Sequence, residues 1–463
     1  MDKKENLSLP PSKKRTYRIC FASDFFYPSI GGVEMHQYQL AQCLMELGHR
    51  VIVVTKAYNN RQGVRYLSNG LKVYYLPYHP SLDTVIMPGA MLHAPLYRKI
   101  LIREQIEILH WHQATSSLGH EIQWVAKGLG IRVIYSDHSL FGFGDAASIN
   151  LNKEMKIILS DTDAAICVSY TCKENLALRA QIDPQMIFTI PNAVDPTKFT
   201  PDPSRRYPLN TKNIVVLSRL AYRKGIDLLV DIIPSICKAY PEAYFIIGGD
   251  GPKRYLVEEM RDKYRLHNRV EMLGSVPYEN VRNVLVRGHI FLNTSLTESF
   301  CTAIVEAASC GLLVVSTNVG GVPEVLAPEM RYLAPPKKDE LIQALKQALE
   351  QAHNVPSHKF HEMIKEMYNW HHVAERTENV YNIVMNSKPY PLLLRVKMIN
   401  SAGPWAGIYA LFIFALFYIG LKILNKIDPA EKIEKAEDFP YETYKYNRHL
   451  LNHHLDLKGE KKT

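Results

Sequence analysis

The sequence has few cysteines, and none is arranged for a disulfide framework or a metal centre. Seven cysteines are scattered over 463 residues, without a Cys-x-x-Cys pair or the spacing of zinc ligands. This distribution excludes a small disulfide-stapled secreted domain and a zinc-finger module. We expect reduced thiols in a cytosolic environment.

The first residues lack the apolar stretch of a secretory signal peptide. Residues 1–16 are instead charged and contain prolines, and we expect them to be disordered. A first strand follows directly, so translocation of the main body is not expected. The bulk of the chain is therefore predicted to be cytosolic.

Internal repeats and low-complexity tracts are also missing, and neither sign of charge strongly dominates. Lys and Arg number 55 against 46 Asp and Glu, which gives a formal net charge of +9. Hydrophobic residues reach 47%, enough for ordinary globular cores, and the length favours two domains. The positive charge suits phosphate-bearing ligands or anionic membranes, although a mildly basic surface explains it equally well. No nucleic-acid partner is expected.

One long hydrophobic run is present near the C-terminus. Residues 404–421 read PWAGIYALFIFALFYIGL, and the uncharged stretch extends back to Met398. We predict one transmembrane helix over residues 404–424, because this length just suffices to cross a bilayer. A buried or interfacial helix is the alternative. Basic residues flank both sides, so the missing signal peptide decides the orientation and places the polar tail, residues 425–463, on the far side of the membrane.

Apolar strands alternate with helical segments in two series, a pattern typical of parallel α/β domains. We expect Rossmann-like lobes over residues 17–205 and 213–355, joined by a Pro-rich linker, and a helical segment over residues 356–390 that packs across both. Neither lobe has a convincing dinucleotide fingerprint, so a ligand is expected in the cleft between them. The predicted strands are residues 18–23, 50–56, 106–112, 132–137, 164–169, 186–192, 213–220, 243–249, 270–276, 289–295 and 312–318.

Two short motifs offer groups that suit a phosphate. Gly31 and Gly32 stand between the first strand and the first long helix, where glycine lets a ligand approach backbone N–H groups at a helix start. A simple turn is the commoner meaning of such a pair. Arg219 and Lys224 lie between a strand and a helix of the second lobe. Together they could neutralise a diphosphate, or they could be solvated loop charges.

The most specific stretch runs from residue 296 to residue 324. Glu298 lies in a loop and Glu306 eight residues further, inside a short helix. The first carboxylate can accept hydrogen bonds from sugar hydroxyls, and the second can accept both hydroxyls of a ribose. Backbone N–H groups at the helix start would face the distal phosphate, and they belong to Phe300, Cys301 and Thr302. Surface charges are the alternative for the two carboxylates.

Glu298 and Glu306 match the Glu-x7-Glu element of retaining glycosyltransferases with the GT-B fold. The ordered motifs GGVE, SDHS, IPNAVD, SRLAYRKGID, GGDGPKR, LGSVP and VGGVPE extend this resemblance over about residues 18–326. More narrowly, SDFFYPSIGGVE, SDHSLFGF, CVSYTCKEN, IPNAVDP, LTESFC and VEAASCG resemble the catalytic subunits of phosphatidylinositol N-acetylglucosaminyltransferase. The resemblance implies an α/β GT-B fold with two Rossmann-like lobes, an inter-lobe cleft and one C-terminal transmembrane helix.

The narrower resemblance also implies a reaction and a location. N-acetylglucosamine would pass from UDP-GlcNAc to phosphatidylinositol with retention of configuration, the first step of GPI-anchor synthesis. The enzyme would sit in the endoplasmic reticulum membrane beside other membrane subunits, with cytosolic lobes and a short lumenal tail. Another lipid-linked glycosyltransferase, such as a mannosyltransferase, is the enzyme alternative. A non-catalytic scaffold within a membrane complex is the alternative from another class.

Roles for the donor-site residues follow from the same resemblance. Gly32 would approach the donor phosphates, while Arg219 and Lys224 would bind the diphosphate. Glu298 would hold the transferred sugar, and Glu306 would hold the ribose. Electrostatic stabilisation of the departing diphosphate would be the main catalytic contribution.

Three further residues complete the expected site. His138 in SDHS matches the family histidine beside the sugar, and we count it among the catalytic residues. The uracil is expected against the backbone near Val276 in LGSVP. Cys301 stands where many relatives have glycine, which could tighten the space near the sugar.

We expect no metal and no cofactor. Asp161 and Asp163 form an Asp-x-Asp pair of the kind that holds a divalent cation in other glycosyltransferases. The pair directly precedes a predicted strand, however, and Arg219 and Lys224 already supply positive charge. His110 and His112 alternate along a predicted strand and are expected to line the cleft or pack.

Overall fold

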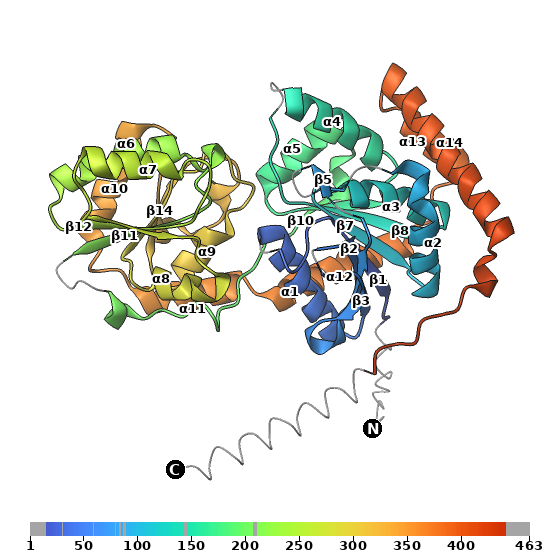
Figure 1. The fold of residues 1–463 in the computed structure, drawn as a ribbon, viewed down its shortest axis with the longest axis horizontal. Coiled ribbons are helices and arrows are strands. Elements are labelled where there is room, and N and C mark those ends of the chain that lie inside the picture. The colour runs from blue at the N-terminus through green and yellow to red at the C-terminus, as the bar shows by residue number, and fades with distance from the viewer. Residues whose placement is uncertain are drawn as a thin grey trace, which may run out of the picture.

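The computed structural model describes residues 15–440, except residues 30, 59, 79, 83–84, 87–88, 143–145 and 207–210. Two α/β lobes lie side by side, and the last helical residues, 392–427, lie along the outer side of the first lobe, away from the second (Figure 1). The predicted disordered segment, residues 1–16, falls mostly outside the described residues. So do most of the polar tail and part of the predicted linker.

The first lobe is built on an eight-stranded sheet with the order β10-β9-β8-β7-β1-β2-β4-β3. Neighbouring strands are parallel except β3, which is antiparallel to β4. In chain order the strands are β1 Arg18–Ala22, β2 Arg50–Lys56, β3 Gly63–Tyr66, β4 Lys72–Leu76, β7 Ile108–His112, β8 Arg132–Asp137, β9 Ala164–Cys167 and β10 Ile187–Thr189. The short strands β5 Pro80–Leu82 and β6 Val85–Ile86 form a separate pair.

The helices of this lobe cover its sheet and are α1 Gly32–Glu46, α2 Ala94–Arg103, α3 Ser117–Gly128, α4 Ala146–Leu159 and α5 Tyr170–Ala180. β7 and β8 are buried along their whole length, as expected for parallel strands covered on both faces. The carboxyl ends of these strands carry His112 and Asp137. In a sheet of this type, ligands bind outside the carboxyl ends.

The second lobe is a six-stranded parallel sheet with the order β13-β12-β11-β14-β15-β16. Its strands are β11 Lys212–Leu217, β12 Ala243–Gly248, β13 Val270–Gly274, β14 Ile290–Asn293, β15 Leu313–Thr317 and β16 Arg331–Ala334. Its helices are α6 Ile226–Ala239, α7 Arg254–Lys263, α8 Val281–Leu285, α9 Thr302–Ser309 and α10 Lys338–Gln351. The strand order reverses beside β11, so the loops after β11 and β14 open at a topological switch point.

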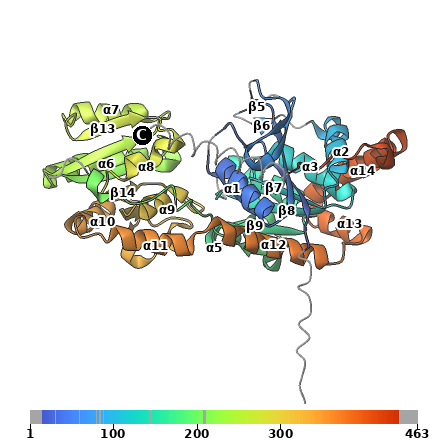
Figure 2. The same cartoon turned by 90° about the horizontal axis from the view of Figure 1, so that it is seen from below.

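The helical segment predicted over residues 356–390 contains two helices. α11 Ser357–Met367 packs on α9 of the second lobe, and α12 Trp370–Asn386 packs on α1 of the first. The break falls at Tyr368 and Asn369, and the Asn369 side chain caps α12 by accepting from the N–H of His371 at 2.8 Å. Figure 2 shows α10, α11, α12 and α13 in a row along one side of both lobes.

α14 Pro404–Ile427 contains the predicted membrane span and is long and apolar enough to cross a bilayer. Together with α13 Leu392–Asn400 it forms a helical hairpin against the first lobe, where Trp124 of α3 lies beside Phe414 and Phe417. Its outward face is also apolar and includes Ile408 and Phe412, each about 60% exposed. A helix that is apolar all round suits a hydrocarbon environment rather than an interface with water.

The segment after α14 returns to the first lobe (Figure 1). Asp438 pairs with Arg18 at 2.9 Å, and the ring of Phe439 lies 5.3 Å from that of Tyr66. These contacts cannot coexist with a tail on the opposite side of a membrane from the lobe. The lumenal position of the tail therefore stays a prediction, and its test is given below.

Candidate active site

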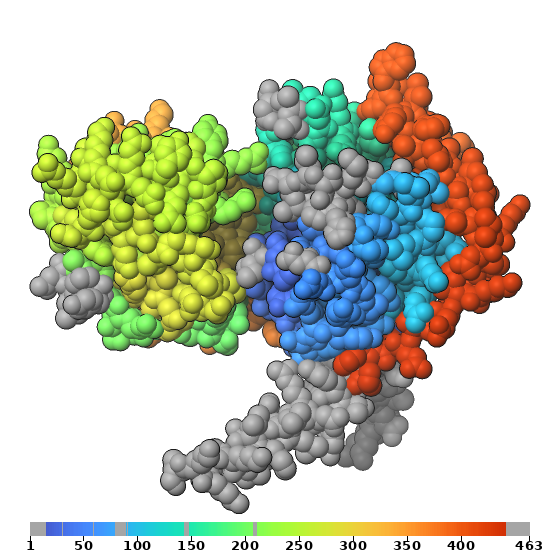
Figure 3. Space-filling view, in the orientation of Figure 1, coloured from blue at the N-terminus to red at the C-terminus, as the bar shows by residue number. Residues whose placement is uncertain are grey.

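A cavity of about 620 Å³ lies between the lobes, and Figure 3 shows the hollow on one face of the molecule. Candidates from both lobes line it. The first lobe contributes Gly31 and Gly32 at the start of α1, and the second contributes Arg219, Val276, Thr302 and Glu306. A Cβ atom built on Gly32 would meet no protein atom within 4 Å. The space beside this glycine is therefore open to a ligand.

Lys224 and Glu298 meet in the second lobe, and neither is among the residues that line this cavity. The Lys224 Nζ lies 2.5 Å from Oε1 of Glu298, and Ser295 donates its hydroxyl to the same oxygen at 2.7 Å. Burial is the largest single effect and lowers the pKa of Lys224, but the charge of Glu298, its hydrogen bond and the nearby Cys301 together outweigh it, so the pKa is raised. Arg219 is close enough for its charge to act on Lys224. Two cations and one carboxylate thus occupy adjacent positions, as expected for a site that takes up an anionic ligand.

Glu306 is buried in the wall of the cavity, on α9. Burial raises the pKa of its carboxyl to about 7, although Lys198 and a hydrogen bond with Tyr278 favour the ionised form. The Lys198 ammonium lies 3.6 Å from the centre of the Tyr278 ring. This carboxyl therefore changes its protonation state near neutral pH, where it can switch between accepting and donating hydrogen bonds.

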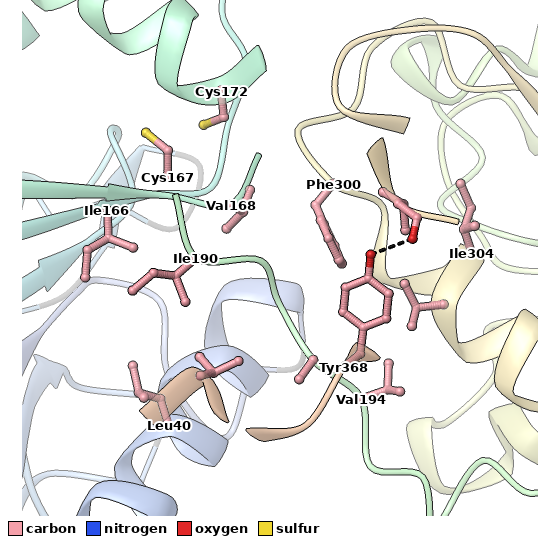
Figure 4. Close-up of a cluster of buried hydrophobic side chains, with 14 of the residues drawn as sticks. Leu40, Ile166, Cys167, Val168, Cys172, Ile190, Val194, Phe300, Ile304 and Tyr368 are labelled. Carbon is pink, nitrogen blue, oxygen red and sulfur yellow. Dashed lines mark hydrogen bonds between the residues drawn. The ribbon is translucent and has the colours of Figure 1, made fainter. Parts of the chain in front are cut away.

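The start of α9 was predicted to face the distal phosphate. Its residues Phe300, Cys301 and Thr302 lie in three different environments. Cys301 caps α9 in the left-handed region, with φ 69°, and Thr302 opens the helix and lines the cavity. The Phe300 side chain points away into the core, where its ring lies 5.6 Å from that of Tyr368. Figure 4 shows Phe300, Tyr368 and Val194 in a buried cluster where the lobes meet. Phe300 therefore offers the site only its backbone.

His138 lies in the first lobe within a buried group of histidines. Its Nε2 is 3.3 Å from Nδ1 of His112, and its ring centre is 4.6 Å from that of His36, which lines the cavity. Burial lowers the pKa of His36 to about 4 and those of His112 and His138 well below their usual value. All three rings are therefore neutral at pH 7. His110 packs behind them and bonds Ser136 and Tyr381 at 2.8 Å each.

Ring nitrogens of His36, His112 and His138 lie within 4.8 Å of one another, so this group could hold a metal by composition. Several of these nitrogens already have partners. Nδ1 of His36 faces Oδ1 of Asn192 at 2.8 Å, and His112 bonds His138. We assign no metal to this group, and the expectation of metal-free catalysis stays a prediction.

The Asp-x-Asp pair lies before β9, at the amino ends of the strands rather than at the carboxyl ends. Asp163 bonds Lys127 at 3.0 Å and Arg132 at 3.2 Å, and it accepts the N–H of Val133 at 2.7 Å. Arg395 of α13 donates to Oδ2 of Asp161 from its Nη2 at 2.6 Å and from its Nε at 3.0 Å. Both side chains are about 3% exposed. Asp161 therefore binds α13 to the first lobe, whereas Asp163 forms its contacts within that lobe.

Sequence reasoning missed several residues that line the cavity. Besides His36, they include Asn192, Asp250, Tyr278 and Trp370. Asn192 lies in the IPNAVD motif and Tyr278 directly follows LGSVP, so both were within reach of the motif pattern. Trp370 opens α12, and its place in the cavity depends on how that helix crosses between the lobes.

Solved structures with the same arrangement of lobes define the class of protein. Sucrose-phosphate synthase from Thermosynechococcus elongatus superposes with a TM-score of 0.66 at 21% identity, covering 80% of this chain and 99% of that one. The Anabaena protein HepE, solved with UDP, gives 0.64 at 17% identity, covering 79% and 99%. A family model for glycosyl transferases group 1 matches residues 202–370. The chain is a glycosyltransferase with the GT-B fold.

Closer relatives define the family within this class. A family model described as PIGA (GPI anchor biosynthesis) matches residues 56–145. A human phosphatidylinositol N-acetylglucosaminyltransferase subunit is 50% identical over 93% of this chain and 90% of its own length. The Arabidopsis thaliana counterpart is 49% identical over 91% and 94%, and the Schizosaccharomyces pombe gpi3 subunit is 47% identical over 95% and 97%. The chain belongs to this family of transferase subunits, as its motifs predicted.

Proposed function

We propose that the protein transfers N-acetylglucosamine from UDP-GlcNAc to phosphatidylinositol with retention of configuration. The observation that carries this proposal is the pairing of Lys224 with Glu298 close to Arg219, which lines the inter-lobe cavity together with Glu306. The names of the relatives, at 47–50% identity over almost the whole chain, support this donor and acceptor.

In this proposal the nucleotide half of the donor lies in the second lobe. Glu306 accepts the ribose hydroxyls, and the uracil lies against the backbone near Val276. Arg219 and Lys224 attract the diphosphate, together with the backbone at the start of α9. Glu298 then leaves its ion pair with Lys224 to accept hydrogen bonds from the sugar, beside His138.

Catalysis rests on stabilising the leaving diphosphate. The bond between the anomeric carbon and the phosphate oxygen breaks as the acceptor hydroxyl oxygen bonds to that carbon on the same face. The acceptor proton passes to the leaving phosphate. Arg219 and Lys224 stabilise the negative charge that develops on UDP, so no protein nucleophile is required.

We further propose that the enzyme sits in the endoplasmic reticulum membrane, with its lobes in the cytosol and its tail in the lumen. α14 supplies the membrane segment by length and composition. Other membrane subunits of a transferase complex are the expected partners, since the relatives are named as subunits.

The test is a donor panel. The full-length chain, purified with its co-purifying subunits, is incubated with phosphatidylinositol and labelled UDP-GlcNAc, UDP-glucose or GDP-mannose. Label should enter a lipid only from UDP-GlcNAc, and digestion with α- and β-specific hexosaminidases should show the donor's α linkage. Transfer from GDP-mannose would indicate the mannosyltransferase alternative. No transfer from any donor, with the subunits present, would favour a scaffold.

A further inference from the structure

Glu324 belongs to the second lobe, and its carboxylate binds a helix of the first lobe. It lies in the 3-10 turn Val322–Glu324 of the second lobe, and its carboxylate reaches the start of α5 in the first. Oε2 accepts the backbone N–H of Tyr170 at 2.6 Å. Oε1 accepts the N–H and the hydroxyl of Thr171 at 2.9 Å and 2.7 Å.

These bonds complete the N-terminus of α5. The first N–H groups of a helix have no partner within the helix. Ser169 caps α5 from its own lobe by accepting the N–H of Cys172 at 3.0 Å. The N–H groups of Tyr170 and Thr171 are satisfied by Glu324, and the negative charge also suits the positive end of the helix dipole. One lobe therefore supplies part of a helix cap to the other.

On the second lobe, the Glu324 turn is bound to the loop that carries Glu298. The N–H of Gly321 donates to the backbone oxygen of Glu298 at 3.0 Å. A Cβ atom on Gly321 would lie 2.1 Å from the oxygen of Ser299 and 2.7 Å from Oγ of Ser169 in the other lobe. The absence of a side chain here lets the turn approach both the Glu298 loop and the first lobe.

On the first lobe, α5 is bound to the loop that carries His138. Arg179 near the end of α5 forms a fully buried ion pair with Asp137, the residue before His138. The Ser299 hydroxyl also crosses the lobe boundary and donates to the backbone oxygen of His138 at 2.6 Å. The His138 loop with α5 and the Glu298 loop with the Glu324 turn thus meet at the boundary between the lobes.

We propose that Glu324 is a positioning residue that fixes the His138 loop against the Glu298 loop when the lobes are closed. This inference rests on the proposed function, because it matters for catalysis only if the sugar is held between these loops. The bonds themselves lie at the surface, so losing them exposes the N–H groups of α5 to water at little cost in folding. Misalignment of about 1 Å between reacting groups, in contrast, can cost on the order of a hundredfold in rate.

The test compares E324Q with E329Q in the full-length chain purified with its subunits. Glu329 is an exposed glutamate five residues away and serves as the matched control. E324Q should lower kcat at least tenfold, because its amide NH2 group replaces one of the two acceptor oxygens and leaves a backbone N–H of α5 facing a donor, while the melting temperature and the UDP dissociation constant stay within error. T171V should lower kcat less, and the double variant should be no worse than E324Q alone.

A second readout does not depend on transfer. A pair of fluorophores, one on α4 and one on α7, should report lobe closure on addition of UDP in the wild type and in E329Q, and reduced closure in E324Q. Normal closure and normal kcat in E324Q would overturn the inference. Altered closure in a chain that transfers no sugar would sustain it while refuting the proposed function.

Discussion

Glu306 provides a pH test at the scale of one residue. Its pKa is raised to about 7, so in the free protein the carboxyl is protonated below pH 7 and ionised above it. The ionised form is the acceptor for two ribose hydroxyls, and binding of UDP should weaken as pH falls. We expect the dissociation constant measured by calorimetry to rise about tenfold from pH 8 to pH 6, as the ionised fraction falls.

The matched variant is Glu306→Gln. It should bind UDP about tenfold more weakly than the wild type at pH 8, lose the pH dependence, and raise KM more than it lowers kcat. A wild-type profile that is flat from pH 6 to pH 8 would contradict the ribose assignment. A variant with normal KM and a collapsed kcat would contradict it as well.

The buried acidic pair provides a stability test. Removing the charge of Asp163 leaves Lys127 and Arg132 buried with less compensation, and Asp163→Asn should lower the free energy of unfolding by about 3–5 kcal/mol. Asp231→Asn, on the exposed face of α6, should change it little. Denaturant titration of both variants is the measurement. If Asp163→Asn kept its stability but lost manganese binding, Asp161 and Asp163 would instead form a metal site.

At the residue scale, motif spacing singled out Glu298 and Glu306 because they are close in sequence and share one loop and helix, and their roles toward a donor stay predictions. His36 and Asn192 could not be paired in this way. They are 156 residues apart and meet only after the first sheet has formed. Glu324 was part of a recognised motif, but its contact with α5 depends on how the lobes meet.

At the scale of elements, a membrane-spanning α14 and the contacts between the tail and the first lobe exclude one another. Moving the outward face of α14 into hydrocarbon contributes roughly 1.5–3 kcal/mol for each large side chain that becomes fully buried. The exposed pairs of the tail, such as Arg103 with Glu434 at 3.4 Å, contribute about 0–1 kcal/mol each. The buried Arg98 contact with Asp428 would also be lost. We expect the bilayer to dominate and the tail to leave the lobe.

Glycosylation of an introduced acceptor site shows on which side of the membrane the tail lies. An Asn-x-Ser acceptor inserted after residue 450 should be glycosylated in microsomes, whereas one placed at residues 5–7 should not. An unmodified tail, combined with reduced activity of Asp438→Ala, would show that the tail stays on the cytosolic lobe. α14 would then lie along the membrane rather than across it.

Long, strongly patterned elements were predicted well from the sequence. β2 and β8 have the predicted bounds, and β12 differs by one residue. Weaker elements escaped notice: β3 is exposed along its whole length, which removes the alternation that marks a strand. The prediction did not divide residues 356–390 into α11 and α12, although Asn369 is a favourable cap for a new helix.

At the scale of the whole molecule, the two lobes divide the chemistry. The second lobe holds Arg219, Lys224, Glu298 and Glu306, and the first holds His138; under the proposed function the former face the leaving group and the latter lies on the acceptor side. The general fold followed from the two series of strands, since each series specifies its own parallel sheet. A cleft between the lobes was expected from the two series and from the resemblance, but the individual inter-lobe contacts could not be predicted, because they join residues far apart in sequence.

The central claim is that fixed protein charges, rather than a metal, stabilise the departing diphosphate. Its most direct test is the initial rate of N-acetylglucosamine transfer by the purified complex, with and without EDTA, for the wild type and for Arg219→Ala and Lys224→Ala. EDTA should change the wild-type rate less than twofold, and each substitution should lower kcat about a hundredfold to a thousandfold. Abolition of wild-type activity by EDTA, restored by manganese, together with a near-normal rate in Lys224→Ala, would contradict the account.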